Sequence, residues 1–227
     1  MFAAVIFDFD GVILDSEPMH YEASRLTLQE IGIHLEYQEY SNEYLGLSDK
    51  EMFPQILMNK KLFYSSNEIS ALVDKKIKHY IHIINNCDRL PITPNVDQCI
   101  RSIARANKKI AICTGSTKRE IFPVLEKINY GHLYSYFDTI VTSEDVQYGK
   151  PSPEGYLLTA KRLNVPTHQC LVIEDSPHGV EAAKKAGMYV MALLTSYERQ
   201  EELQAADKII HNLEELLCVT TNEQVLF

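Results

Sequence analysis

Short apolar runs rich in Val and Ile recur along the chain and predict buried β-strands. Within each run the apolar residues are continuous rather than alternating with polar ones, which is typical of strands in a parallel sheet covered on both faces. The predicted strands are residues 3–9, 109–113, 139–142, 170–173 and 189–193, with helical patterns between them at 96–106, 153–163 and 179–186. Strands that alternate with helices predict a doubly wound, Rossmann-like α/β domain.

The segment from Ser16 to about residue 86 breaks this rhythm, because it contains no convincing strand pattern. Its first helical stretch opens at Ser16 and ends at Gly32. Further helical patterns cover residues 52–58 and 69–84, and a Pro-rich segment, 88–96, leads back. We therefore predict a core domain of residues 1–15 and 88–227 with an all-helical cap domain, residues 16–87, inserted after the first strand. A small domain carried on two hinges there would sit over a site at that strand's carboxyl end.

Composition narrows the class of partner. The formal net charge of −9 and the pI of about 5.4 argue against nucleic acid and against a polybasic membrane contact. No apolar run is long enough to span a bilayer, and MFAAVIFDFD lacks the basic start of a signal peptide. The five Cys form no C-x-x-C pair, so we expect neither a disulfide framework nor a zinc site. The expected protein is cytoplasmic, a monomer or weak homodimer.

Polar side chains follow the predicted strands where each strand ends, and parallel strands bring these ends to one edge of a sheet. They are Asp8 and Asp10 after the first strand, Thr114, Gly115 and Ser116 after the second, Lys150 after the third, and Glu174 and Asp175 after the fourth. Clustered carboxylates need a cation, and oxygen-only ligands select a hard ion such as Mg²⁺.

This mixture of groups suits phosphoryl transfer, which needs mainly positioning and charge neutralisation. A metal ion would leave Asp8 ionised as a nucleophile able to form an aspartyl-phosphate. Asp10 would serve as general acid towards the leaving oxygen and then as base towards water. Thr114, Lys150 and the backbone N–H groups around Gly115 and Ser116 would bind the phosphate.

Four segments in order resemble the haloacid dehalogenase-like hydrolase superfamily, over nearly the whole chain. They are DFDGV at 8–12, CTGS at 113–116, GKPSP at 149–153 and IEDSPHGVEAAKKAG at 173–187. LDSEPMHYEA, followed by a helical insertion, is similar to the branch that holds β-phosphoglucomutase and many small-molecule phosphatases.

The resemblance implies a role for each matching position. Asp8 is the implied nucleophile and Asp10 the general acid/base, whereas Thr114 and Lys150 orient the phosphate. Asp8, Asp175 and the backbone carbonyl of Asp10 are implied Mg²⁺ ligands, and Glu174 is a ligand or a carboxylate just behind them. Two places depart from the family pattern. Asn95 replaces the Gly of Pro-Gly-Val, a change that the tolerance of Asn for positive φ allows. Pro123 predicts a helix start or a kink.

The loop LGLSDKE, residues 45–51, lies in the predicted cap. By resemblance it reads the substrate, through Gly46, Ser48 and Lys50, with His20 as a further candidate. The alternative is a connection between helices in which Ser48 is the next N-cap. The mutase branch carries an Arg where this chain has Asp49, which would repel a second phosphate unless Lys50 compensates. This favours a phosphatase.

Several candidate residues also have purely structural interpretations. Asp145 is either a neighbour of the metal or a turn carboxylate, and Thr114 is either a phosphate ligand or an N-cap. For His20 and His178 we favour exposed or hydrogen-bonded structural roles. Cys113 and Cys170 are expected to be small core residues on strands.

The sequence thus predicts an Mg²⁺-dependent phosphoric monoester hydrolase that acts on a small phosphorylated metabolite, of the sugar phosphate or phosphoglycolate type. The nearest alternative is a β-phosphoglucomutase-like phosphomutase. A dehalogenase is disfavoured because Asp10 is present. A non-enzymatic phospho-acceptor switch is disfavoured by the large insertion, and a degenerate binding protein by the intact set of chemical groups.

Overall fold

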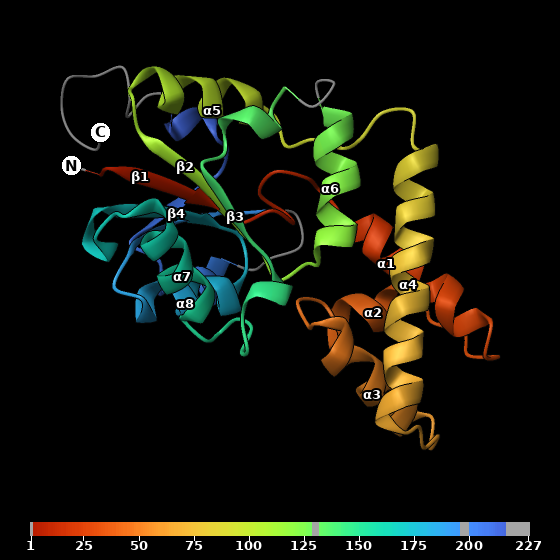
Figure 1. The fold of residues 1–227 in the computed structure, drawn as a ribbon. Coiled ribbons are helices and arrows are strands. Elements are labelled where there is room, and N and C mark those ends of the chain that lie inside the picture. Colours follow the sequence, from red (N-terminus) through yellow and green to blue (C-terminus); the bar gives the residue numbers. More distant parts are fainter. Residues whose placement is uncertain (1, 129–131, 196–199, 217–227) are drawn as a thin grey trace. The chain divides into compact units, whose positions relative to one another are not determined.

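A parallel β-sheet forms the centre of the larger unit of this chain. The computed structural model describes residues 2–128, 132–195 and 200–216. Within them the strand order is β3-β2-β1-β4-β5-β6, and every pair is parallel (Figure 1). The strands are β1 (Ala4–Phe7), β2 (Lys109–Cys113), β3 (Thr139–Val141), β4 (Cys170–Glu174), β5 (Tyr189–Leu193) and β6 (Lys208–Ile210). This order places β1 in the middle, so the loop that follows it leaves from the centre of the sheet.

Helices cover both faces of this sheet. On one face, α5 (Val96–Arg105) packs against β2, and on the other α7 (Glu154–Leu163) and α8 (Pro177–Lys185) pack against β2 to β5 (Figure 1). The remaining helix of this unit is α6 (Lys118–Lys127). Short 3-10 turns cover Tyr134–Tyr136, Ser143–Asp145, Thr167–Gln169 and Gln200–Leu203.

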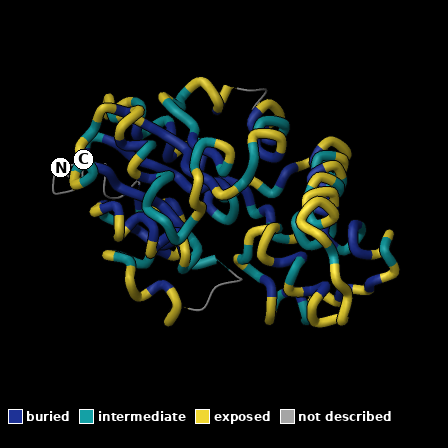
Figure 2. The backbone as a smooth tube through the Cα atoms, turned by 60° about the horizontal axis from the view of Figure 1, so that its bottom comes forward, coloured by how far each residue is buried: buried dark blue, intermediate teal, exposed yellow. Residues whose placement is uncertain are grey.

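The central strands β1 and β4 are buried at every residue, as their continuous apolar runs require (Figure 2). Successive side chains alternate between faces, so Ala4 and Ile6 belong to the core cluster under α7 and α8. Cys113 and Cys170 lie in that same cluster, fully or almost fully buried, which confirms them as core residues. Cys218 lies outside the described residues.

The helical unit consists of Ser16–Arg89, whereas Met1–Asp15 and Leu90–Phe227 make up the other unit. It contains α1 (Glu17–Gln29), α2 (Tyr37–Glu43), α3 (Asp49–Asn59) and α4 (Ser66–Asn86). Its own core includes Leu28, Tyr44, Phe53 and Ile56, which are buried together. None of the helices in the described residues is both long and apolar enough to cross a membrane.

The structure confirms the predicted α/β fold with a helical insertion and corrects several local predictions. The sequence pattern missed α2 and the short edge strand β6. Pro123 does not start a helix, because α6 begins at Lys118 with a capping box between Thr117 and Glu120. Thr117 also replaces Thr114 as the N-cap of that helix, so the N-cap interpretation of Thr114 is wrong. Asn95 adopts φ 66°, as its tolerance for the left-handed region allows.

Candidate active site

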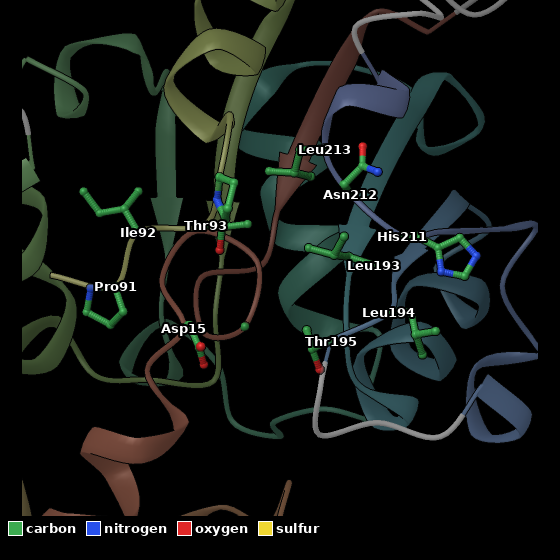
Figure 3. Close-up of a pocket in the computed structure, with 12 residues that line it drawn as sticks. Asp15, Pro91, Ile92, Thr93, Leu193, Leu194, Thr195, His211, Asn212 and Leu213 are labelled. Carbon is green, nitrogen blue, oxygen red and sulfur yellow. The ribbon is translucent and has the colours of Figure 1, made fainter.

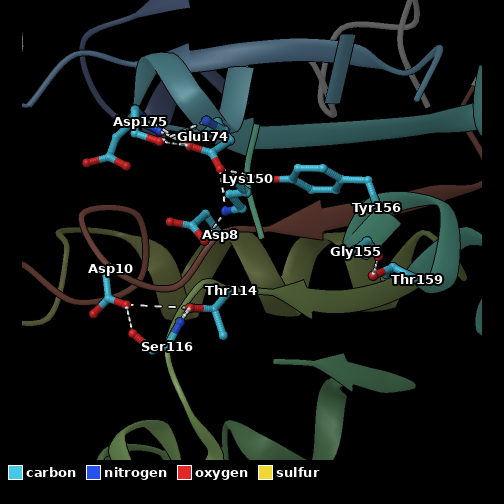
Figure 4. A network of polar contacts seen from close by, with 12 residues as sticks. Asp8, Asp10, Thr114, Ser116, Lys150, Gly155, Tyr156, Thr159, Glu174 and Asp175 are labelled. Atoms are coloured by element: carbon cyan, nitrogen blue, oxygen red, sulfur yellow. Dashed lines mark hydrogen bonds and ion pairs between the residues drawn. The ribbon is translucent and has the colours of Figure 1, made fainter. Parts of the chain in front are cut away.

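The carboxyl edge of the sheet gathers the charged side chains that the strand ends predict. Asp8 follows β1 directly, and its backbone N–H donates to the carbonyl of Ile173 in β4 at 2.9 Å. This hydrogen bond continues the β1–β4 ladder by one residue and fixes the position of Asp8 beside the end of β4. Lys150 reaches the same place from the loop before α7 (Figure 4). The side chains therefore converge although they are far apart in the sequence.

Lys150 bridges two buried carboxylates. Its Nζ donates to Asp8 Oδ1 at 2.6 Å and to Glu174 Oε1 at 2.5 Å. The side chain of Lys150 is 16% exposed, that of Asp8 8% and that of Glu174 0%. In so little water the ammonium is the principal counter-charge that either carboxylate has among the described residues.

Burial and crowding set the charge states of these groups. Burial raises the pKa of Asp8 to about 7, helped by Glu174 and Asp10 and opposed by Lys150. Burial also disfavours the ionised form of Glu174, but Lys150 and the hydrogen bonds to its oxygens keep the Glu174 pKa below its usual value. Although burial opposes its charge, the two carboxylates raise the pKa of Lys150, so the ammonium stays protonated. Among Asp8, Glu174 and Lys150, only Asp8 is therefore shifted towards its neutral form.

Glu174 accepts hydrogen bonds at both oxygens. Oε1 accepts from Lys150 Nζ and from the hydroxyl of Tyr156, the latter at 2.8 Å. Oε2 accepts from the backbone N–H groups of Asp175 and Ser176 at 3.0 and 3.1 Å and from Ser176 Oγ at 3.0 Å. The sequence pattern assigned no role to Tyr156 or Ser176, and no local signal distinguishes Tyr156 from the other apolar-face residues of its helix.

Two glycines make room for these carboxylates. A Cβ atom at Gly179 would lie 1.7 Å from Glu174 Oε1, and one at Gly11 would lie 1.8 Å from Asp175 Oδ2. Gly11 also has φ +76°, which disfavours other residues. The glycines of DFDGV and of DSPHG therefore serve close approach to the carboxylates.

The donor set suits a hard divalent cation. Asp8, Glu174 and Asp175 each offer a carboxylate oxygen, and these oxygens all lie within 4.8 Å of one another. All are hard oxygen ligands, the type that Mg²⁺ prefers. Burial and the neighbouring carboxylates raise the pKa of Asp8, so a cation beside Asp8 would favour its ionised form. Glu174 already accepts hydrogen bonds from Lys150, Tyr156 and Ser176, which leaves its oxygens less able to bind a cation.

Asp10 lies with the polar residues that follow β2. Ser116 Oγ donates to Asp10 Oδ2 at 2.6 Å, and Thr114 Oγ1 lies 3.5 Å from the same oxygen. The backbone N–H of Ser116 donates to Thr114 Oγ1 at 3.0 Å. The structure therefore brings Asp10, Thr114 and Ser116 together, as the convergence of strand ends predicts (Figure 4).

The larger unit also contains a pocket of about 290 Å³. Asp15 and Ile92 line one side, and Leu193, His211 and Leu213 line the other (Figure 3). None of the strand-end carboxylates lines it, and Gly11 belongs to its wall. The pocket and the carboxylate cluster are therefore distinct parts of the larger unit.

The predicted substrate-reading residues all lie in the helical unit. Ser48 is the N-cap of α3, where its N–H donates to Glu51 Oε2 at 3.0 Å in a capping box, as the structural alternative expects. Gly46 adopts φ +77°, and Lys50 is exposed on the first turn of α3. A role for these residues in substrate recognition stays a prediction.

His20 belongs to a partly buried polar cluster in the helical unit. Its Nδ1 accepts from Lys76 Nζ at 2.8 Å, and its ring stacks on Tyr80 with centroids 4.4 Å apart. The Lys76 side chain is 3% exposed and pairs with Asp49 Oδ2 at 3.0 Å. Asp49 thus neutralises a buried lysine.

We expect Asp49→Asn to lower the free energy of unfolding by about 2–3 kcal/mol, because it removes a carboxylate that pairs with the buried Lys76 ammonium. Glu39→Gln is the matched control: it removes an exposed ion pair with Lys60 and should cost less than about 1 kcal/mol. Urea unfolding of both variants measures the difference. Equal shifts in the two midpoints would show that Lys76 does not depend on Asp49.

Of the two remaining candidates, Asp145 has a clear structural role. Asp145 closes a capping box with Thr142 and pairs with Arg162 at 2.8 Å, and these contacts lower its pKa far below the usual range although burial opposes them. It is a turn carboxylate, as one of the two interpretations held. His178 is exposed on α8.

Comparisons with known proteins identify the family of the chain. A family model described as haloacid dehalogenase-like hydrolase matches residues 5–193. The phosphorylated carbohydrates phosphatase of Thermotoga maritima is 33% identical over 185 residues, which cover 82% of each chain. CbbY from Rhodobacter sphaeroides, solved in complex with phosphate, superposes with a TM-score of 0.85 at 26% identity, over 95% of this chain and 96% of that one. A β-phosphoglucomutase from Clostridium difficile gives 0.81 at 29% identity, over 98% of both chains.

Proposed function

Because the chain belongs to the haloacid dehalogenase-like hydrolase family, we propose that it is a phosphatase of small phosphorylated carbohydrates or related phosphomonoesters. The proposed reaction uses Mg²⁺ and passes through an aspartyl-phosphate on Asp8. The observation that carries the proposal is the buried Asp8, paired with Lys150 at 2.6 Å and close to Asp175. A phosphatase among the relatives, named for phosphorylated carbohydrates, supports the substrate class.

In the first proposed step an ionised Asp8 oxygen attacks phosphorus in line, and the bond from phosphorus to the leaving oxygen breaks. Lys150 favours this step because its ammonium stabilises the ionised form of Asp8. Asp10 donates its proton to the leaving oxygen, so the alcohol departs neutral. Thr114 and the backbone N–H groups around Gly115 orient the phosphate oxygens.

In the second proposed step Asp10 takes a proton from a water molecule as the water oxygen attacks phosphorus. The bond between phosphorus and Asp8 then breaks, and phosphate leaves. Ser116 and Thr114, whose hydroxyls lie 2.6 and 3.5 Å from Asp10 Oδ2, keep the Asp10 side chain in place between its two proton transfers.

Mg²⁺, held by Asp8, Asp175 and the backbone carbonyl of Asp10, would supply the positive charge that offsets the phosphate and the crowded carboxylates. Removal of divalent cations with EDTA should therefore lower phosphate release by at least about 100-fold, and added Mg²⁺ should restore it. The measurement is phosphate release against free Mg²⁺ concentration. Full activity after exhaustive chelation would contradict the metal requirement.

The proposed function is tested by a screen of phosphomonoesters with Mg²⁺, including hexose phosphates, pentose phosphates and phosphoglycolate. Release of inorganic phosphate from at least one of them is the expected result. A phosphomutase is the second candidate, because the chain is similar to a β-phosphoglucomutase. Isomerisation of β-glucose 1-phosphate that depends on a bisphosphate primer, without net phosphate release, would favour it.

A further inference from the structure

Tyr156 is a buried tyrosine on α7 that touches the charged cluster in two ways. Its hydroxyl donates to Glu174 Oε1 at 2.8 Å, and the Lys150 Nζ lies 5.3 Å from its ring centroid (Figure 4). Burial, and then the charge of Glu174, raise the pKa of Tyr156 well above its usual value, so the hydroxyl remains a proton donor. The same side chain thus contacts both members of the Lys150–Glu174 pair.

The helix that carries Tyr156 is firmly anchored. Tyr156 belongs to the core cluster with Ala160 and Leu163, on the face of α7 that packs against β2 and β3. In the first turn, Glu154 accepts hydrogen bonds from the backbone N–H groups of Gln147 and Tyr148, both at 2.9 Å. The Tyr156 ring therefore stands on a rigid element, and the loop that bears Lys150 is tied to the same helix.

Apart from Lys150, the other hydrogen bonds to Glu174 all act at Oε2, so the Tyr156 hydroxyl matters for Oε1. The backbone N–H groups of Asp175 and Ser176 and the Ser176 hydroxyl all hold Oε2. At Oε1 the only uncharged donor among the described residues is the Tyr156 hydroxyl, which fixes the plane of the carboxylate. Lys150, the other donor to Oε1, depends in turn on that oxygen for its own position, 2.6 Å from Asp8.

From these contacts we infer that Tyr156 is a positioning residue for the reaction. Its hydroxyl holds Glu174 Oε1 in place, and Glu174 in turn holds the Lys150 ammonium against Asp8. This inference rests on the proposed function, in which Lys150 stabilises ionised Asp8. Loss of the hydroxyl leaves every charged group present but lets the Lys150 ammonium shift, and a misplaced charge lowers the rate of the chemical step more than substrate binding.

The test is Tyr156→Phe, which removes one oxygen atom and keeps the ring. With the best phosphomonoester from the screen and saturating Mg²⁺, we expect kcat to fall about tenfold while KM changes by less than about twofold. Tyr136→Phe is the matched control, because it also removes a hydroxyl from this unit, one that accepts from Arg101 at 3.0 Å. The control should keep kcat within about twofold, with both variants assayed at a temperature where circular dichroism shows them folded.

A double-mutant cycle separates positioning from packing. In a Glu174→Gln background, Tyr156→Phe should lower kcat by less than about twofold further, because the Glu174 carboxylate that the Tyr156 hydroxyl holds is already gone. Wild-type kcat in Tyr156→Phe, an equal loss in both Tyr→Phe variants, or the same tenfold loss in the Glu174→Gln background would each overturn the inference.

Failure of the proposed function gives a different result. If the wild-type protein neither hydrolyses nor isomerises any phosphomonoester, the function is wrong, and crystal structures of wild type and Tyr156→Phe then decide the role of Tyr156. A displaced Lys150 ammonium or rotated Glu174 carboxylate in the variant would support the positioning role. Unchanged Lys150–Asp8 and Lys150–Glu174 distances would overturn it.

Discussion

Asp8→Asn is expected to lower phosphate release by at least about 10⁴-fold while the protein stays folded. The amide cannot attack phosphorus as a carboxylate does, so the first step loses its nucleophile. The fold should tolerate the change, because Asn is isosteric and removes one of the carboxylates that crowd one another; Glu174 and Asp10 both raise the pKa of Asp8. Lys150 keeps its contact with Glu174.

Three measurements check this result. Steady-state phosphate release gives the rate, thermal unfolding gives the stability, and mass spectrometry of acid-quenched protein detects a phosphorylated chain. Wild type should show the covalent intermediate and Asp8→Asn should not. Asp97→Asn is the control, because Asp97 lies on α5 in an exposed pair with Arg101 and should retain full activity. Wild-type turnover by Asp8→Asn with Mg²⁺ present would refute the proposed mechanism.

Asp10→Asn is expected to lower kcat by about 10²–10⁴-fold for esters of poor leaving groups, the usual contribution of a general acid or base. Asn keeps the size of the side chain and can still accept from Ser116, which lies 2.6 Å from Asp10 Oδ2. What it loses is the proton for the leaving oxygen and the base for the attacking water. These two losses affect different steps of the reaction, so esters with good and with poor leaving groups should distinguish them.

With p-nitrophenyl phosphate the leaving group needs little protonation, so the first step should survive in Asp10→Asn. The second step still lacks its base, and the phosphorylated protein should accumulate. A stopped-flow experiment should therefore show a rapid burst of about one p-nitrophenol per protein followed by slow turnover. A uniform loss of rate for all leaving groups, with no burst, would argue that Asp10 only binds or positions. Ser116→Ala, which removes a hydrogen bond to Asp10 but not the carboxylate, should show no such burst.

The core of the fold follows from patterns that are local in the sequence. Two of the predicted strands, 109–113 and 189–193, coincide with β2 and β5, because a run of Val and Ile buried on both faces has few other stable environments. By contrast, β6 has only three residues, two of them half-buried at the sheet edge, and its pattern is too short to stand out. The helix start suggested by Pro123 is wrong, because the capping box at Thr117 sets the start of α6 earlier.

The reactive groups of the candidate site were also predictable, because carboxylates, an ammonium and hydroxyls follow strands whose carboxyl ends meet at one edge of the sheet. Lys150 and Asp8 are 142 positions apart, yet each follows a strand of the same parallel sheet, so their meeting at one edge of the sheet could be predicted. Which side chains each of these groups contacts could not be predicted. Whether Glu174 faces a metal ion or is held by Lys150, Tyr156 and Ser176 depends on side-chain packing between β4, α7 and the loop before it.

By itself, then, the sequence determined the parallel sheet, the helical insertion and the set of reactive groups, because hydrophobic periodicity and strand-end polarity are properties of short segments. Only the tertiary structure decided which groups pair: Lys150 with both Asp8 and Glu174, Tyr156 with Glu174, and Lys76 with Asp49 and His20. The physical reason is that buried charges and hydroxyls must find partners wherever packing brings them. Tyr156, which the sequence pattern indicates only as an apolar-face residue of α7, therefore contacts the charged site.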